Sequence, residues 1–309
     1  MPSGLYINYN DGRPAMEITA NLRCPSFCRN VGSAGSITEV ISEYIPGSQL
    51  IYIPSRAAAY SPPSGTAIIG TVSYLRNVTF NGALMTHDSV DNNGIWAGQV
   101  WQLLPVNSPS GNRGLLIANS TDFSVISDVT RIMTCIWHGN ITINGQAAAP
   151  TSGVLFAKWN HPTASITLEN GVLYARESRT DSSDVNANVT IYAAIFNVSS
   201  PTPGVGLNII NSSGQCTFST TRKPLIYSGS FSPTSNWQDI GSNMVTLGTY
   251  GYEASNGGGW CNMRLRGLMM SGNSVKTGNS KITWQWTDRY SIVGSRNVGI
   301  SIPLIPDIY

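Results

Sequence analysis

The chain has 309 residues, of which 11% are charged and 41% hydrophobic, with a formal net charge of +2. So few charges argue against long solvated helices, and the hydrophobic content argues against disorder. The 18 Lys and Arg are scattered, apart from the pairs Arg222-Lys223 and Arg264/Arg266, so we expect no nucleic-acid partner. No apolar run approaches the roughly 20 residues of a membrane span. Because the first residues also lack a signal peptide, we expect synthesis in the cytoplasm.

A short pattern occurs three times along the chain. A Gly-Leu dipeptide opens an apolar strand that runs into an Asn-rich turn, at residues 4–12, 114–122 and 206–214. A second apolar stretch with Ser or Thr and then an Arg follows each turn: Thr19 and Arg23, Ser127 and Arg131, Ser219 and Arg222. The starts lie 110 and 92 residues apart, which is the size of a domain.

Two Pro/Gly/Ser-rich stretches, 107–113 and 199–204, stand just before the second and third copies and are typical of linkers. We therefore predict three β modules, an N-terminal one at 1–108, a middle one at 109–202 and a C-terminal one at 203–309. They are called the first, middle and third segments below.

Stretches rich in β-branched and aromatic residues, bounded by turn residues, predict strands. In chain order they are 15–19, 49–54, 66–80, 100–106, 132–137, 153–158, 165–168, 172–176, 188–196, 216–220, 225–230, 244–250, 261–268, 281–286 and 298–302. Asn-Gly pairs beginning at residues 81, 93, 144 and 170 suit tight hairpin turns. The predicted fold class is all-β, with tandem antiparallel β-sandwich modules and little helix. The expected exception is a short helix that begins at the capping-box spacing of residues 36–39 and reaches Tyr44.

Patterns typical of catalysis are missing from the sequence. No Gly-x-Ser-x-Gly elbow accompanies the histidines, which we interpret as loop or sheet-surface residues: His87, His138 and His161. Two close acid pairs have the composition of a glycosidase site but are more simply solvated loops: Asp88 with Asp91, and Asp181 with Asp184. No phosphate-binding glycine motif is present. We therefore expect no enzyme and no nucleotide cofactor.

Cysteine usage gives no metal site. Cys24 and Cys28 have a spacing that occurs in zinc sites, but no second Cys or His pair completes the ligand set. Buried free thiols are the simpler interpretation. We expect no metal-binding residue.

The aromatic residues give the candidates for surface recognition. The eight tryptophans either fill the core or contact a sugar or a protein partner: Trp96, Trp101, Trp137, Trp159, Trp237, Trp260, Trp284 and Trp286. Trp284 and Trp286 are two apart and share one face of a strand. Trp260 follows the Gly-rich residues 256–259, so we predict an exposed recognition surface at Trp260, Tyr250 and Tyr252.

The third copy of the repeat, extended over residues 206–225, resembles a motif of small proteins encoded among the tail-tip genes of lambda-like siphophages and prophages. The shared features are a Gly-Leu strand, an Asn-x-x-Gly turn, an apolar-Ser strand and a basic residue before Pro224-Leu225. Residues 302–309 resemble the Pro-rich close of that family. Residues 2–27 resemble the start of a larger uncharacterised phage family of similar length. The middle copy departs from the pattern, with Asp122 at the turn glycine.

The resemblance implies a non-enzymatic structural protein of the virion tail tip, made in the host bacterial cytoplasm. It implies other tail proteins as partners, at the central fibre, hub or baseplate, and a homo-oligomer or threefold arrangement. The alternative is a lectin-like or protein-binding module that contacts a receptor on the host cell surface. An enzyme acting on envelope sugars is a further alternative, for which the sequence offers only the two acid pairs.

Overall fold

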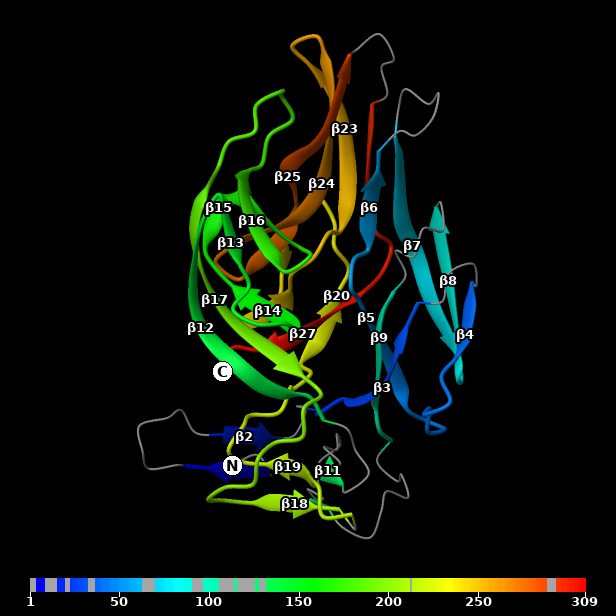
Figure 1. The fold of residues 1–309 in the computed structure, drawn as a ribbon, viewed down its shortest axis with the longest axis vertical. Coiled ribbons are helices and arrows are strands. Elements are labelled where there is room, and N and C mark those ends of the chain that lie inside the picture. Colours follow the sequence, from blue (N-terminus) through cyan, green and yellow to red (C-terminus); the bar gives the residue numbers. More distant parts are fainter. Residues whose placement is uncertain are drawn as a thin grey trace.

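The computed structural model describes residues 4–8, 16–19, 23–32, 37–62, 70–90, 97–105, 114–115, 126–127, 132–211, 213–287 and 293–309. Within these ranges every regular element is a β-strand, and all strand pairs are antiparallel (Figure 1). The predicted all-β class is therefore confirmed.

The first segment contains two sheets that follow its opening hairpin. One is three-stranded, in the order β3 (Ser26–Val31), β9 (Gly98–Leu103), β5 (Gln49–Pro54). The other is four-stranded, in the order β4 (Thr38–Val40), β8 (Leu84–Val90), β7 (Thr71–Asn81), β6 (Ala58–Ser61). With the hairpin left aside, the first strand of the segment, β3, and the last, β9, are therefore neighbours.

The middle segment repeats this pairing. Its first, last and third strands lie in the order β12 (Thr134–Asn144), β17 (Asn188–Asn197), β14 (Val154–Lys158). Its other strands lie in the order β13 (Gln146–Ala148), β16 (Val172–Glu177), β15 (His161–Glu169). No strand in residues 132–198 corresponds to β6, since β14 is followed directly by β15.

The third segment shows the same pairing once more. Its first, last and third strands lie in the order β20 (Gly229–Phe231), β27 (Ile302–Pro306), β22 (Asn243–Thr246). The others lie in the order β21 (Gln238–Asp239), β25 (Ser274–Thr287), β24 (Trp260–Ser271), β23 (Gly251–Gly257), β26 (Gly294–Asn297). One pattern of strand pairing therefore occurs three times along the chain, without a counterpart of β6 in the middle segment and with β26 added in the third.

The sheets of the middle and third segments are joined edge to edge. Phe156 of β14 pairs with Thr246 of β22, and Ile166 of β15 pairs with Leu268 of β24. These contacts make one 14-stranded sheet that crosses the predicted boundary at residue 202. The division at 108 and 202 stays a prediction, and the structure adds that the last two segments share a continuous hydrogen-bonded sheet.

Each copy of the Gly-Leu repeat forms a separate two-stranded hairpin. The three hairpins are β1 (Gly4–Ile7) with β2 (Met16–Thr19), β10 (Gly114–Leu115) with β11 (Ile126–Ser127), and β18 (Asn208–Ile210) with β19 (Cys216–Ser219). In the third copy the Asn211 side-chain oxygen accepts hydrogen bonds from the amides of Ser213 and Gln215, at 3.0 and 2.9 Å. This Asx turn explains why Asn is needed there.

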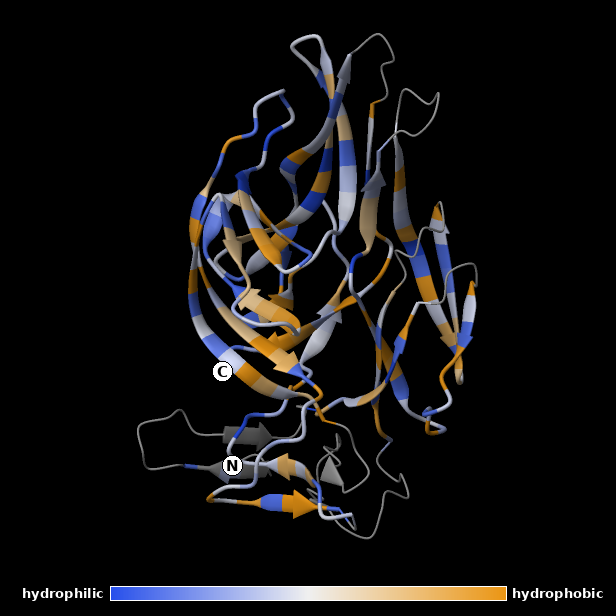
Figure 2. Cartoon of the chain, in the orientation of Figure 1, coloured by the Kyte–Doolittle hydropathy of each residue, from blue (hydrophilic) through white to orange (hydrophobic). Residues whose placement is uncertain are grey.

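Buried side chains of all three segments form one connected core cluster, which includes Leu75, Ile166 and Leu268. Hydrophobic and hydrophilic residues alternate along β12, as expected for a strand with one buried face (Figure 2). At the predicted turn between β15 and β16, Asn170 and Gly171 have φ of 51° and 77°, which is the conformation that an Asn-Gly hairpin turn requires. The pair at 93–94 lies outside the described residues.

The predicted helix at 36–44 is wrong. Residues Thr38–Val40 form β4, which pairs with β8, and Ser36 lies outside the described residues. The Glu39 carboxylate lies 4.0 Å from the Arg29 guanidinium. β-Branched residues on both sides of Glu39 favour the extended backbone, and the available partner strand decides the outcome.

Candidate functional site

Of the three aromatic residues predicted to be exposed, the structure brings only Trp260 clearly to the surface. Trp260 is 47% exposed and begins β24 after a turn in which Gly258 and Gly259 have positive φ. Tyr252 is half-buried, with its ring 5.6 Å from that of Tyr74.

Tyr250 is not a surface residue, which corrects the prediction. It is buried, and its hydroxyl lies 2.8 Å from the Thr246 hydroxyl and 2.9 Å from the Thr246 carbonyl oxygen. Burial raises the pKa of Tyr250 above its usual range. The strand pattern could not reveal this, because Tyr250 lies beyond the end of β22 and bonds back to Thr246, the last residue of that strand.

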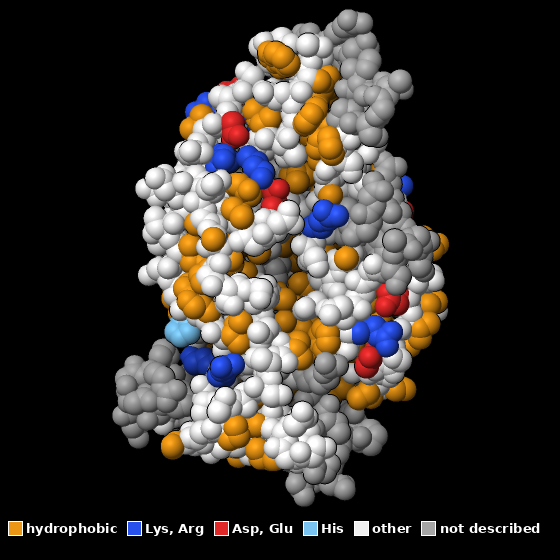
Figure 3. All heavy atoms as spheres, viewed as in Figure 1, with side chains coloured by type: hydrophobic (Ala, Val, Ile, Leu, Met, Phe, Trp, Pro, Cys, Tyr) orange, Lys and Arg blue, Asp and Glu red, His pale blue; other side chains and the backbone are white. Residues whose placement is uncertain are grey.

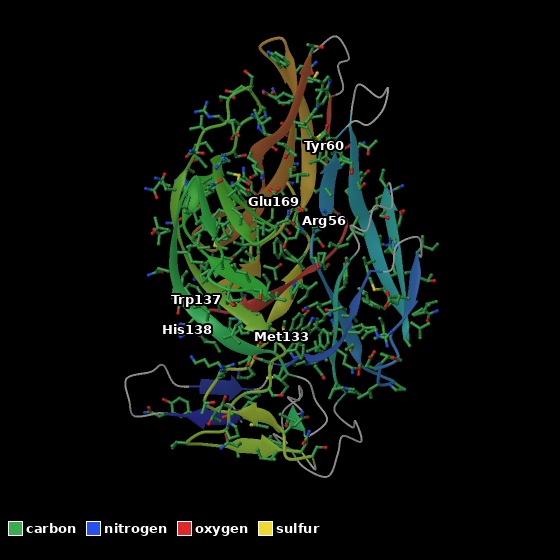
Figure 4. All side chains as sticks on the ribbon, in the orientation of Figure 1. Arg56, Tyr60, Met133, Trp137, His138 and Glu169 are labelled. Atoms are coloured by element: carbon green, nitrogen blue, oxygen red, sulfur yellow. The ribbon has the colours of Figure 1, made fainter. Side chains whose placement is uncertain are left out.

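The exposed tryptophans do not form one platform. In the pairing of β24 with β25, Trp260 is opposite Thr287 and Cys261 is opposite Trp286, so Trp260 points to the face away from Trp284 and Trp286. Trp284 stacks on Tyr60 at 5.9 Å between ring centroids, in the upper part of the molecule (Figure 4). Of the remaining tryptophans, Trp96 lies outside the described residues.

β24 carries two buried arginines, of which Arg264 joins the middle and third segments and Arg266 has its printed partners within the third. Arg264 is 1% exposed and donates hydrogen bonds to the carbonyl oxygens of Asp181 and Ser183, at 2.7 and 2.8 Å. Arg266 is 9% exposed and donates to Ser235 and Asn297, at 3.2 and 3.0 Å. Burial lowers the pKa of both guanidinium groups. The sequence showed these residues as a basic pair but did not indicate that Arg264 contacts another segment.

A polar cleft of about 360 Å³ lies beside Arg266, between the two segments. Its lining includes hydroxyl, amide and charged side chains from both segments: Thr163, Ser178, Thr180, Ser235, Glu253, Arg266, Lys276, Thr277 and Asn279. Within the described part of the chain, Arg266 Nε and Asn279 Oδ1 are buried without a hydrogen-bond partner. The cleft therefore offers donors and acceptors suited to a polar ligand such as a sugar.

The histidines and acid pairs are dispersed over the fold, and the interpretation of all three histidines as loop or sheet-surface residues is wrong for His87, which is 3% exposed. His87 is buried in β8, His138 Nδ1 lies 3.1 Å from the Tyr192 hydroxyl, and His161 Nδ1 accepts the amide of Ala164 at 3.1 Å. These three rings belong to different strands, β8, β12 and β15, and form no shared site.

The acid pairs have local structural partners. Asp184 pairs with Arg176 at 2.9 Å, and the Asp181 carboxylate accepts the Ser183 amide at 3.0 Å. This hydrogen bond, with the Ser183 hydroxyl, lowers the pKa of Asp181. Asp88 lies 3.6 Å from Arg76, whereas Asp91 lies outside the described residues. The described acids therefore match the interpretation as loop and surface residues.

Cys24 and Cys28 are both buried, at 6% and 0% exposure. Among the described residues, no group of three or more His, Cys, Asp or Glu side chains could hold a metal ion. Burial raises the pKa of the Cys135 thiol to about 11. In the described ranges we also find no helix with the length and hydropathy of a bilayer span.

The segments that follow the three hairpins are joined by a ring of backbone bridges. The bridges are Ser26 to Ile132, Thr134 to Pro224 and Tyr227 to Arg23. They link the first segment to the middle, the middle to the third, and the third back to the first. We call these three bridges the bridge ring. All of its residues lie within five positions of the arginine that follows each copy of the repeat. The position of these arginines in the sequence could therefore have located the bridge ring.

The core beside the bridge ring receives buried side chains from all three segments, among them Phe27, Met133 and Leu225, and Figure 4 labels Met133. Tyr309 enters the same cluster, with its ring 4.9 Å from Phe196. The Tyr309 hydroxyl donates to the Pro224 carbonyl oxygen and accepts the amide of Ile226, each at 2.9 Å. The final residue of the chain therefore fixes the third segment's part of the bridge ring.

A protein-family model described as a family of unknown function (DUF6453) matches residues 4–288. No curated protein and no solved structure matches the chain.

Proposed function

We propose that the chain, which belongs to the DUF6453 family, is a non-enzymatic structural component of a bacteriophage tail tip. The observation that carries the proposal is the threefold repetition of one pattern of strand pairing, joined by the bridge ring. A rigid scaffold that presents repeated surfaces suits assembly around the central fibre or hub. The resemblance of residues 206–225 to tail-tip proteins supports the same role.

The surface composition agrees with assembly into a particle. Only 11% of residues are charged, and on the face drawn in Figure 3 the charged side chains form small groups separated by uncharged surface. Hydroxyl and amide groups can pair with neighbouring proteins at a smaller desolvation cost than charges. We propose the virion as the location of the protein, after synthesis in the host cytoplasm.

The test is mass spectrometry of purified phage particles, with antibody labelling to locate the chain. We expect peptides of this chain at a fixed ratio to known tail proteins, and label at the tail tip. Deleting the gene should give particles that lack a normal tip. If gradient-purified particles contain no peptide of the chain, the proposal is wrong.

Receptor binding is the second candidate function, and exposed Trp260 together with the polar cleft favours it. If the surface around Trp260 contacts the host, the purified chain should bind susceptible cells and compete with phage adsorption. Trp260→Ala should then weaken competition at least tenfold, whereas Trp237→Ala, also at an exposed Trp, should not. Equal competition by both variants would remove Trp260 from this role.

A further inference from the structure

The three hairpins formed by the repeat lie at one end of the molecule. Figure 1 shows β1, β2, β11, β18 and β19 at the lower end of the long axis, below the sandwiches. Each hairpin is a two-stranded sheet that pairs with no third strand among the described residues. No described strand pairs with their outer backbone edges, which is the geometry that strand addition from a partner uses.

The bridge ring shows how the hairpins are arranged. Ser26 and Thr134, the first residues of β3 and β12, bridge to Ile132 and Pro224, which lie between the next hairpin and the strand that follows it. Tyr227 closes the circle by bridging to Arg23. This order is the one that three copies related by a threefold axis would have, so the chain carries an internal cyclic arrangement of its repeats.

Apolar side chains are exposed at the same end. Tyr6 of β1 is 64% exposed, and in the third copy Val205 and Leu207 are 98% and 40% exposed. Tyr6 follows the Gly-Leu dipeptide of its copy, while Val205 and Leu207 flank Gly206. Two hairpins therefore present apolar groups near equivalent places in the repeat, which is a feature of contact surfaces.

We propose that this end of the chain docks one homotrimeric partner protein, with one hairpin meeting each of its three identical subunits. The inference rests on the proposed role in tail assembly. A trimer presents the same surface three times around its axis. A single chain with three cyclically arranged hairpins can meet all three surfaces through similar contacts, and the three contacts reinforce one another because they are linked.

Counting copies separates this arrangement from a homo-oligomer. In cryo-electron microscopy of purified particles, one copy of the chain should lie on the threefold axis of the trimer, hairpin end inward, giving one chain per three partner subunits. Three copies of the chain around the axis, or contact through the opposite end, would overturn the docking inference alone. Absence of the chain from wild-type particles would overturn the proposed function as well.

A variant pair tests the surface itself. Val205→Glu with Leu207→Glu should reduce the copies of the chain per particle at least tenfold, since charges oppose burial. Val293→Glu is the matched control, because Val293 is 67% exposed and precedes β26, which belongs to the other end. Both proteins should retain the wild-type melting temperature. Wild-type incorporation of the hairpin variant would contradict docking.

The purified chain supplies the remaining outcome. Light scattering should show a monomer. A dimer that the Val205→Glu, Leu207→Glu variant abolishes would mean that a second copy of this chain covers the hairpins, and the trimeric partner would be rejected.

Discussion

Replacing Tyr309 by phenylalanine is expected to lower the free energy of unfolding by about 1–3 kcal/mol. The hydroxyl makes two buried hydrogen bonds of 2.9 Å, to the Pro224 carbonyl oxygen and from the Ile226 amide. Phenylalanine keeps the edge contact with Phe196 but leaves these backbone groups without partners. The cost is their desolvation, because the site is closed to water.

Tyr309→Ala removes the ring as well, and truncation of a buried aromatic side chain typically costs about 3–5 kcal/mol. Urea unfolding followed by tryptophan fluorescence gives both values. Tyr6→Phe is the control, since Tyr6 is 64% exposed and its change should stay within about 0.5 kcal/mol. If Tyr309→Phe unfolds at the wild-type urea concentration, the hydroxyl does not hold the bridge ring.

Three further predictions concern other contacts. Gly299→Ala should destabilise the fold by about 2–4 kcal/mol in the same assay, because the added Cβ would lie 1.8 Å from the Arg76 carbonyl oxygen. Gly294→Ala is the control and should be close to neutral, since a Cβ at this position meets no described atom within 4 Å. Burial raises the pKa of Cys135 from 9.0 to about 11, so at pH 9 iodoacetamide should alkylate it about 50-fold more slowly than in the unfolded chain. The contribution of the neutral thiol to the free energy of unfolding should be lost as the pH rises from 9 towards 11. A normal rate would contradict the burial. Arg264→Met should cost about 1–3 kcal/mol and speed hydrogen exchange in the loop that the guanidinium holds; unchanged exchange would show that the loop is held otherwise.

Local signals in the sequence predicted the local structure well. The strand expected at 49–54 is β5 with the same bounds, and the Asn170-Gly171 turn has the φ values that its residues favour. In both cases the preference of a few neighbouring residues decides the conformation. The all-β class follows from many such segments.

Long-range pairing explains what the sequence did not reveal. β25 begins at Ser274, although residues 274–279 are mostly polar, because each of these six residues pairs with β24. The same cause turned the expected helix into β4, whose partner β8 lies more than 40 residues later. Propensity gives way when a neighbouring strand satisfies the backbone.

The candidate sites were predicted only in part. Trp260 is exposed as expected, as the first residue of β24 directly after a turn of two glycines with positive φ. Tyr250 is buried, and Arg264 of β24 marks an interface that depends on carbonyl groups about 80 residues away. Such partners leave no periodic trace in a single sequence, so only the fold shows them.

The edge-to-edge joining of the last two segments has a consequence for biosynthesis. Phe156 in β14 can pair with Thr246 in β22 only after about 90 more residues have been synthesised. At ordinary translation rates this takes about 5–18 s. During that interval the middle segment has two strands whose final neighbours do not yet exist. Strand edges of this kind invite pairing between nascent chains, so slow translation or high expression is expected to favour aggregation of this protein before its last strand is made.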